Sequence, residues 1–216
     1  MDLRSGYIRS MIRRMLVIGG TSAIGKALCP LLEKKYDVYS VGSSSFSLPM
    51  CNPDWSKFDM VINLAAILTE GYLDKDDIMD KLVIDVNCLG SVRILNTFLP
   101  YMKGQGFGRI IMMSSVYSAI NVRGQGIYSA TKAFVDKLVK IAAIENAEYG
   151  VTVNSIQLGY TGIGMGEMTE GDSDRALARI GMKRFVTIEE IYKTIDYIVN
   201  TEYLTGQNIR LDGGIR

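Results

Sequence analysis

A tyrosine and a lysine four residues apart are the pair best placed for proton transfer. Tyr128 and Lys132 lie near the start of a helix predicted over 128–149, which Gly150 ends. Positions i and i+4 share one face of a helix, so the phenol and the ammonium point the same way. A phenol has a pKa of about 10. A nearby ammonium favours the phenolate and lowers that pKa toward the range of a general acid or base. A solvated helix face with the same spacing is the alternative.

Polar residues near strand ends and inside a helix are the next candidates. Ser114 and Ser115 follow a strand predicted over 109–113, at the edge where open α/β sheets bind ligands. Serine there also serves ordinary turns. Asn63 lies within an apolar strand predicted over 60–64, where a buried amide needs partners. Asn87 lies in an amphipathic stretch, as a surface residue or as a partner of a backbone carbonyl at a helix distortion.

A glycine-rich turn joins a predicted strand at 15–18 to a helix that begins near Ser22 and runs to Lys35. Gly19 permits a tight turn, and Gly25 lets the helix pack closely on the sheet. The helix start directs free N–H groups and a positive dipole end toward a pyrophosphate. Thr21 and Ser22 add hydroxyl donors. A glycine-rich turn without a ligand is the alternative.

The region after the second predicted strand, 38–41, bears on the choice of nucleotide. An acid about 20 residues after the glycines would clamp a ribose 2′-hydroxyl. The chain has Gly42 followed by three serines, 43–45, with neither an acid nor an arginine. Ser43 is therefore a candidate contact for a 2′-phosphate, which favours NADP over NAD, and a solvated serine-rich turn is the alternative.

Strands alternate with helices along the chain, which predicts an α/β fold with a doubly wound parallel sheet of the Rossmann type. A helical stretch over 76–99 is expected to stop at Pro100. Further strands are predicted over 151–157 and 208–211, with a capping box at 187–190. Only 43–58 separates the second strand from the next long one, so that segment is shortened, with a short strand near 48–51 and Trp55 over apolar surface. We expect a mobile extension over 1–14 and one domain over 15–216.

Composition removes several classes of function. The 216 residues contain no histidine, which excludes Ser-His-Asp and Cys-His mechanisms and most zinc or iron sites. Cys29, Cys51 and Cys88 are widely spaced and suit buried thiols in a reducing cytoplasm, with no metal site. A net charge of +1 gives no footprint for nucleic acid. No apolar run approaches the ~18 residues of a membrane span, so we expect no membrane partner.

Taken together, these motifs resemble the short-chain dehydrogenase/reductase family over residues 15–216. The turn resembles the family's Thr-Gly-x3-Gly-x-Gly motif, with Ile18 and Ala23 departing from it. Residues 63–66, Asn-Leu-Ala-Ala, are similar to Asn-Asn-Ala-Gly, and 158–161 to the Pro-Gly segment beside nicotinamide, with Leu158 for Pro. The endings 204–207 and 211–214 are also similar. The pattern is closest to 3-oxoacyl-carrier-protein reductases.

The resemblance implies a role for each matching residue in a reaction where the cofactor, NADP or NAD, carries the hydride. Tyr128 exchanges a proton with the substrate oxygen, and Lys132 lowers the tyrosine pKa and holds the nicotinamide ribose. Ser115, thirteen residues before Tyr128, bonds the substrate oxygen, and Asn87 holds a water that joins Lys132 to solvent. The implied cofactor contacts are Gly19, Thr21, Ser22, Ile24, Gly25, Ser43, Asn63, Ala65, Tyr128, Lys132, Gly159 and Thr161.

Substrate, activity and assembly remain expectations. A glycine- and methionine-rich segment over 162–183 predicts a substrate lid or a plain surface loop. An oxidoreductase acting on a small-molecule carbonyl/alcohol pair is favoured over a cofactor-binding scaffold, which Ala23, Leu158 and the shortened 43–58 would suit. A nucleotide-sugar epimerase also fits the motifs but needs a larger C-terminal region. Apolar residues on several faces of 76–99, and the tyrosine helix, predict a homodimer or homotetramer.

Overall fold

The computed structural model describes residues 12–42, 57–74, 78–164 and 170–216. One six-stranded sheet, with strand order β2-β1-β3-β4-β5-β6, organises the chain. The strands are β1 (Arg14–Ile18), β2 (Asp37–Val41), β3 (Met60–Asn63), β4 (Gly108–Ser115), β5 (Val151–Leu158) and β6 (Asn208–Leu211). Every adjacent pair is parallel. The predicted doubly wound parallel sheet is confirmed.

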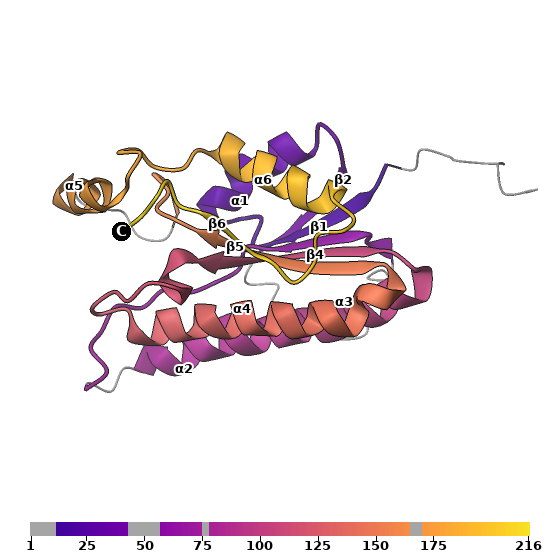
Figure 1. Ribbon diagram of the computed structural model, residues 1–216, viewed down its shortest axis with the longest axis horizontal. Helices are drawn as coiled ribbons and strands as arrows, with labels where there is room; N and C mark the ends of the chain where they lie inside the picture. Colours follow the sequence, from indigo (N-terminus) through magenta and orange to yellow (C-terminus); the bar gives the residue numbers. More distant parts are fainter. Residues whose placement is uncertain (1–11, 43–56, 75–77, 165–169) are drawn as a thin grey trace, which may run out of the picture.

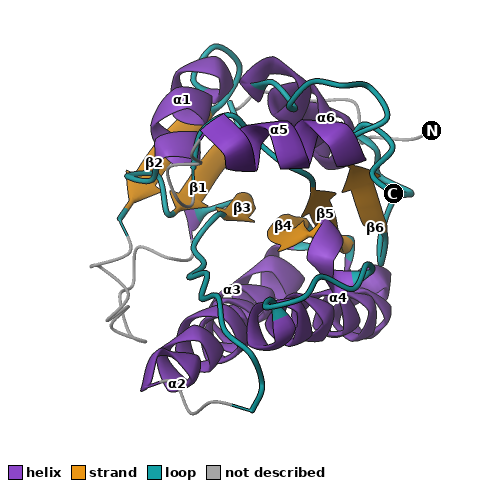
Figure 2. Cartoon of the chain, turned by 90° about the vertical axis from the view of Figure 1, so that its left-hand side faces the viewer, coloured by secondary structure: helices purple, strands orange, loops and turns teal. Residues whose placement is uncertain are grey.

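Helices cover both faces of this sheet (Figure 1). On one face lie α1 (Ala23–Leu32) and α6 (Ile188–Asn200); on the other lie α3 (Gly90–Gln105) and α4 (Gly126–Asn146). A short α2 (Ile78–Ile84) leads through a π-helical turn, Asp85–Leu89, into α3. Helix α5 (Glu170–Arg179) lies beyond one end of the sheet, on the side of α1 and α6, as the turned view also shows (Figure 2).

Alternation along the buried strands divides the core into two layers. In β1, Leu16 and Ile18 face the α3–α4 layer, whereas Met15 and Val17 face the α1–α6 layer. Strand β4 alternates in the same way, with Ile110 on the first side. All of β1 except Arg14, and all of β3, β4 and β5, are buried, as expected for parallel strands covered on both faces.

Some boundaries differ from those predicted. Strand β1 begins at Arg14, inside the expected extension, because the Arg14 amide donates to Asp59 at 3.0 Å and its guanidinium pairs with Asp37. Residues 1–11 of that extension lie outside the described part of the chain. Strand β4 continues through Ser115, so both serines end the strand instead of following it. Helix α1 ends at Leu32, three residues short of Lys35.

The prediction that the helix stops at Pro100 is wrong. Helix α3 continues to Gln105 with Pro100 inside it, and Gly106 at φ 71° ends it. Pro100 is exposed. At an exposed position, water can satisfy the carbonyl that the proline cannot bond, which reduces the penalty. The short strand expected near 48–51 lies outside the described residues, and so do Cys51 and Trp55.

The helical run 78–105 is long and apolar enough to cross a membrane, by length and composition only. The sequence prediction of no such segment was therefore too strict. Ile94, Leu95 and Phe98 of this run are packed in the core against the sheet. A helix in the core of a globular protein passes the same test, so this finding is weak evidence for a membrane span.

Candidate functional site

Four neighbouring strands bring the predicted site residues to one edge of the sheet. Gly19 follows β1, Asn63 ends β3, Ser115 ends β4 and Gly159 follows β5. These strands are adjacent and parallel, so their carboxyl ends lie together. Strand β2 lies on one side of β1, and the chain then crosses over to place β3 on the other side. The strand order therefore reverses at β1, and ligands of open α/β sheets bind at such a switch point.

The glycine turn is packed too tightly for side chains. Gly19 has φ +86°, and a Cβ there would lie 2.9 Å from the Ala65 amide nitrogen. A Cβ on Gly25 would lie 2.5 Å from the Gly19 carbonyl oxygen and 2.6 Å from the Gly20 Cα. These contacts explain the glycines at 19 and 25 and bring the start of α1 against the turn.

The start of α1 offers free amides to a ligand. Ser22 is the N-cap, and its Oγ accepts from the Gly25 amide at 3.0 Å. Within the described residues, the amides of Ala23 and Ile24 have no hydrogen-bond acceptor. Both amides lie at the positive end of the helix dipole, an arrangement that suits a pyrophosphate. Ala23, which departs from the family's glycine, is exposed at the first helical position and keeps the turn intact.

Other predicted cofactor residues surround this turn. Asn63 is buried, and its Oδ1 accepts from the Ala65 amide at 3.1 Å, which fixes the loop that faces Gly19. Thr21 is exposed and lies beside Gly42. A Cβ added to Gly42 would lie 2.8 Å from Thr21 Oγ1. The side chain of Ile24 reaches toward Gly164 in the segment after β5. Ser43 lies outside the described residues.

The segment after β5 closes the other side of this edge. The Gly159 amide donates to the Leu211 carbonyl at 2.9 Å, and a Cβ on Gly159 would lie 2.7 Å from the Asp212 Cα. Thr161 pairs with Val186 in an isolated bridge, and its hydroxyl donates to the Ile163 carbonyl. Both predicted residues, Gly159 and Thr161, therefore line the mouth of the sheet edge, while Leu158 is buried as the last residue of β5.

Tyr128 and Ser115 meet at this mouth. Tyr128 is 7% exposed in the first turn of α4, near enough to Ser115 for that side chain to act on the pKa of the phenol. Ser115 Oγ also accepts from the Tyr117 amide at 3.2 Å, which orients the hydroxyl. Burial raises the pKa of Tyr128 to about 12, against the smaller opposing effect of Ser115. The phenol is therefore a neutral proton donor near pH 7.

Lys132 lies beside the phenol, where burial is the dominant influence on the pKa of Tyr128. Its ammonium donates to the Met113 carbonyl at 2.8 Å and lies 5.5 Å from the centre of the Tyr128 ring. Burial lowers the pKa of Lys132 to about 8. An ammonium has three donors, and in the described part of the chain Lys132 uses one. The remaining donors of this buried group fit the hydroxyls of a nicotinamide ribose.

Asn87 holds the π-helical turn in place. Its Nδ2 donates to the Ile67 carbonyl at 2.9 Å and to Thr131 Oγ1 at 3.0 Å, while its Oδ1 accepts from the Ile67 amide at 2.8 Å. Ser91 Oγ donates to the Asn87 carbonyl at 2.7 Å. The amide thus partners a carbonyl at a helix distortion, the second of the two predicted alternatives. Both Nδ2 donors are used, so only acceptor positions remain for a water.

The sequence prediction missed a buried carboxylate one helical turn beyond Lys132. Asp136 accepts from Ser155 Oγ at 2.8 Å and from Gln157 Nε2 at 2.7 Å, and Gln157 Nε2 also reaches Ser118 Oγ at 2.9 Å. The Asp136 charge opposes the fall in the pKa of Lys132. The i, i+4 spacing from Lys132 was the available signal.

Two tyrosines beside the site were also missed. Tyr117 stands edge-on to Tyr128, with ring centres 6.2 Å apart. Its hydroxyl lies 2.7 Å from that of Tyr160. Tyr117 comes two residues after Ser115 and Tyr160 directly after Gly159, so their proximity to predicted site residues was the signal.

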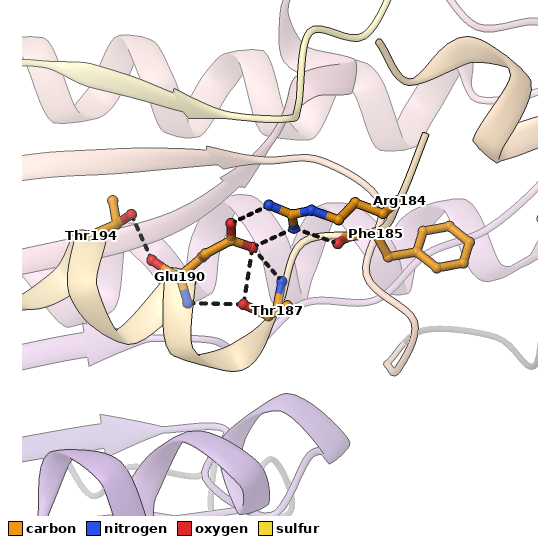
Figure 3. Close-up of polar contacts among 5 residues, drawn as sticks. All are labelled: Arg184, Phe185, Thr187, Glu190 and Thr194. Carbon is orange, nitrogen blue, oxygen red and sulfur yellow. Dashed lines mark hydrogen bonds and ion pairs between the residues drawn. The ribbon is translucent and has the colours of Figure 1, made fainter. Parts of the chain in front are cut away.

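The start of α6 lies close to the segment after β5, because Val186 pairs with Thr161. Figure 3 shows the polar contacts at this helix start. Arg184 forms two bonds with the Glu190 carboxylate, at 2.7 and 2.8 Å, and Thr187 caps the helix in the predicted capping box. A cavity of about 250 Å³ lies next to this cluster, lined by Tyr160, Met182, Arg184, Val186, Glu190, Arg210, Leu211, Asp212, Gly213 and Gly214. In the described residues no three His, Cys, Asp or Glu side chains gather as a metal site would require.

Comparison with known proteins decides the family. The family model described as Enoyl-(Acyl carrier protein) reductase matches residues 35–216. The chain belongs to the short-chain dehydrogenase/reductase family. A similar protein is the 3-oxoacyl-[acyl-carrier-protein] reductase FabG of Staphylococcus epidermidis, 35% identical over 162 residues, which are 73% of this chain and 66% of that protein. The chain thus spans about two thirds of that relative's length.

Solved structures of the family share the fold. One is a short chain dehydrogenase from Leptospira borgpetersenii with bound NAD+, with a TM-score of 0.81 and 20% identity over 94% of this chain and 92% of that one. Another, ElxO with NADP bound, has the same TM-score and identity and covers 94% and 98%. At 20% identity, these likenesses show that this chain shares their fold.

Proposed function

We propose that this protein transfers a hydride between a nicotinamide cofactor and a carbonyl/alcohol substrate, with Tyr128 as the proton donor and acceptor. The observation that carries the proposal is the placement of the buried Tyr128 beside Ser115, the last residue of β4, with the buried Lys132 one helical turn further along α4. When bound, the dinucleotide supplies the hydride. The similarity to 3-oxoacyl-[acyl-carrier-protein] reductases supports the reduction of a 3-oxoacyl thioester or a related ketone.

The residues act in a fixed arrangement during reduction. Ser115 donates a hydrogen bond to the substrate oxygen, and Tyr128 Oη delivers its proton to that oxygen as charge develops there. The raised pKa keeps this proton in place until it is needed. Lys132 holds the ribose with its free donors, and Asn87 keeps a water near Lys132 through its remaining acceptors. In the reverse direction Tyr128 receives the proton.

The amides of Ala23 and Ile24, with Thr21 and Ser22, hold the pyrophosphate, and Asn63, Ala65, Gly159 and Thr161 line the dinucleotide. We propose NADP as the preferred cofactor because the sequence has no acid at 42–45 to bond a 2′-hydroxyl. Cys29 and Cys88 are free and buried, which supports a cytoplasmic location.

Steady-state oxidation of NADPH with a panel of ketones tests the proposal, comparing the wild type with Tyr128→Phe. The phenylalanine keeps the ring but has no phenolic proton, so kcat falls by about 100-fold or more, while the Kd from NADPH titration changes far less than kcat. Tyr197→Phe, at an exposed position, is the control and keeps its rate. Equal rates for Tyr128→Phe and wild type, or NADPH binding without any turnover, would instead fit a cofactor-binding scaffold.

A further inference from the structure

A chain of three polar side chains leads away from Tyr128 and is not used by the proposed reaction. Tyr117, in the 3-10 turn Val116–Ser118 after β4, touches the Tyr128 ring edge-on at an interplanar angle of 86°. The Tyr117 and Tyr160 hydroxyls are 2.7 Å apart. Arg179, the last residue of α5, donates from Nη1 to the Tyr160 hydroxyl oxygen at 3.3 Å.

Arg179 is fixed in position by the C-terminal end of the chain. Its Nε donates to the Arg216 carbonyl at 3.4 Å, and the Arg216 amide donates to the Arg179 carbonyl at 3.2 Å. These two bonds to Arg216 hold the Arg179 guanidinium in its position beside Tyr160. Because a guanidinium has only donors, Tyr160 must accept in this contact.

The Tyr117–Tyr160 pair has one hydroxyl proton more than its hydrogen bonds use. Two phenols contribute two protons, and the bond between Tyr117 and Tyr160 uses one of them, whichever oxygen donates. Among the described residues no further acceptor for either hydroxyl is present. Burial raises the pKa of Tyr117, so its phenol keeps its proton at neutral pH. One phenolic O–H, polarised by the Arg179 cation through the chain, is thus free for a ligand.

The surroundings suit a partly apolar ligand with an oxygen acceptor. Both tyrosines pack against a small apolar cluster formed by Val116, Ile180 and Ile215, with Ile120, Leu177 and Phe185 beside it. Tyr160 also lines the cavity of about 250 Å³. Apolar walls with a few placed donors are typical of small-molecule sites.

We propose that Tyr117, Tyr160 and Arg179 determine substrate specificity by forming a subsite that holds a second oxygen acceptor of the substrate. This inference rests on the proposed function. The reacting carbonyl oxygen lies at Ser115 and Tyr128. The second oxygen accepts the free phenolic proton, and no covalent bond changes there. Holding the substrate at two points fixes the reacting carbon relative to Tyr128.

The test compares two ketones of similar length that differ in the second oxygen. Ethyl 3-oxobutanoate has an ester carbonyl next to the ketone, and 2-heptanone has none. In Tyr117→Phe, kcat/KM for the oxo ester falls about tenfold, as expected for loss of one hydrogen bond, while kcat/KM for 2-heptanone changes less than about twofold. Tyr160→Phe behaves in the same way. Tyr149→Phe, at an exposed position far along the chain, is the control.

A second measurement separates recognition from a structural role. In the presence of NADP+, 3-oxobutanoate raises the midpoint of thermal unfolding of the wild type, and Tyr117→Phe loses most of that increase. Without ligand, the midpoints of wild type and variant agree within a few degrees. If Tyr117 had only a structural role, Tyr117→Phe without ligand would unfold at a lower midpoint, and its kcat/KM would fall equally for both ketones. That result would overturn the inference.

The outcomes distinguish this inference from the proposed function. If the wild type reduces both ketones but Tyr117→Phe leaves their kcat/KM ratio unchanged, the subsite is wrong and the proposed reaction stands. If the wild type reduces neither ketone and gives no thermal shift with 3-oxobutanoate, both are contradicted.

Discussion

At the scale of single residues, the site depends on how burial changes proton affinity. Burial raises the pKa of Tyr128 and lowers that of Lys132, so each group favours its neutral form. The sequence placed Tyr128 and Lys132 together because helix spacing is regular, and the family resemblance added Ser115. It could not rank burial against charge, since the depth of each group depends on the packing of α4 on β5. Asp136 belongs to the same environment because it opposes the fall in the pKa of Lys132.

Asp136→Asn tests this residue-scale account. The negative charge that favours the ammonium is removed, so Lys132 loses its proton at lower pH. We expect the alkaline limb of the pH profile of kcat/KM for reduction to move to lower pH. Cys88 and Tyr128, the other titratable groups near Lys132, are unchanged.

Ser155→Ala is the control for this change, because it removes one hydrogen bond to Asp136 but keeps the charge. Its pH profile stays close to that of the wild type. The role assigned to Asp136 is wrong if the alkaline limb of Asp136→Asn coincides with that of the wild type while the variant remains folded by circular dichroism.

At the scale of elements, local signals predicted helix starts well and helix ends less well. The capping box at Thr187 and the N-cap at Ser22 were readable because a few adjacent residues determine them. Pro100 misled because the cost of a proline depends on whether water reaches the carbonyl it leaves unbonded, which is a property of the packed helix. The π-helical turn at Asn87 depends on Ile67 and Thr131, which are distant in sequence.

Thr187→Ala tests the contribution of the cap to α6. Its hydroxyl oxygen accepts from the Glu190 amide at 3.2 Å, and Glu190 accepts from the Thr187 amide at 2.9 Å. We expect the free energy of unfolding in urea at pH 7 to fall by about 1 kcal/mol, as for other N-caps. Thr97→Ala in α3, whose hydroxyl bonds only a helical carbonyl, is the control and changes it much less.

The pH dependence of this cap has a defined sign. Hydrogen bonds from Arg184 and from Thr187 lower the pKa of Glu190 to about 2, from its ordinary value of 4.5. Its contribution is therefore present above about pH 4.5 and is lost as the pH falls toward 2. The difference between wild type and Thr187→Ala should shrink over that range, and a difference that grows on acidification would contradict the assignment.

At the scale of the whole molecule, the outer surface of α2, the π-helical turn and α4 carries unusually many apolar side chains. Ile78 is 92% exposed and Ile144 78%, and Leu82, Leu89, Phe134 and Ile141 are also exposed. Val83, which the sequence grouped with this surface, is buried instead. The sequence predicted the layered sheet correctly because alternation of strands and helices determines it. The apolar periodicity alone could not divide core from outer surface.

Static light scattering at micromolar concentration tests the predicted assembly. We expect a mass of two or four times 23.9 kDa, because burial of this surface against a second copy removes apolar area from water. Phe134→Glu combined with Ile144→Glu places charges in the contact and shifts the mass toward the monomer. Tyr203→Glu, a fully exposed position elsewhere, does not. A wild-type mass of 23.9 kDa would refute the assembly.

The central claim is that a hydride passes from the nicotinamide to a carbonyl carbon held at Ser115 and Tyr128. Mass spectrometry of the product formed from NADPH deuterated at the transferred position of nicotinamide C4, with ethyl 3-oxobutanoate as substrate, tests it most directly. The account predicts a 3-hydroxy ester with one deuterium on the carbinol carbon from the wild type, and no detectable labelled product in the same time from Tyr128→Phe. An unlabelled product, or labelled product formed equally fast by both proteins, would contradict it.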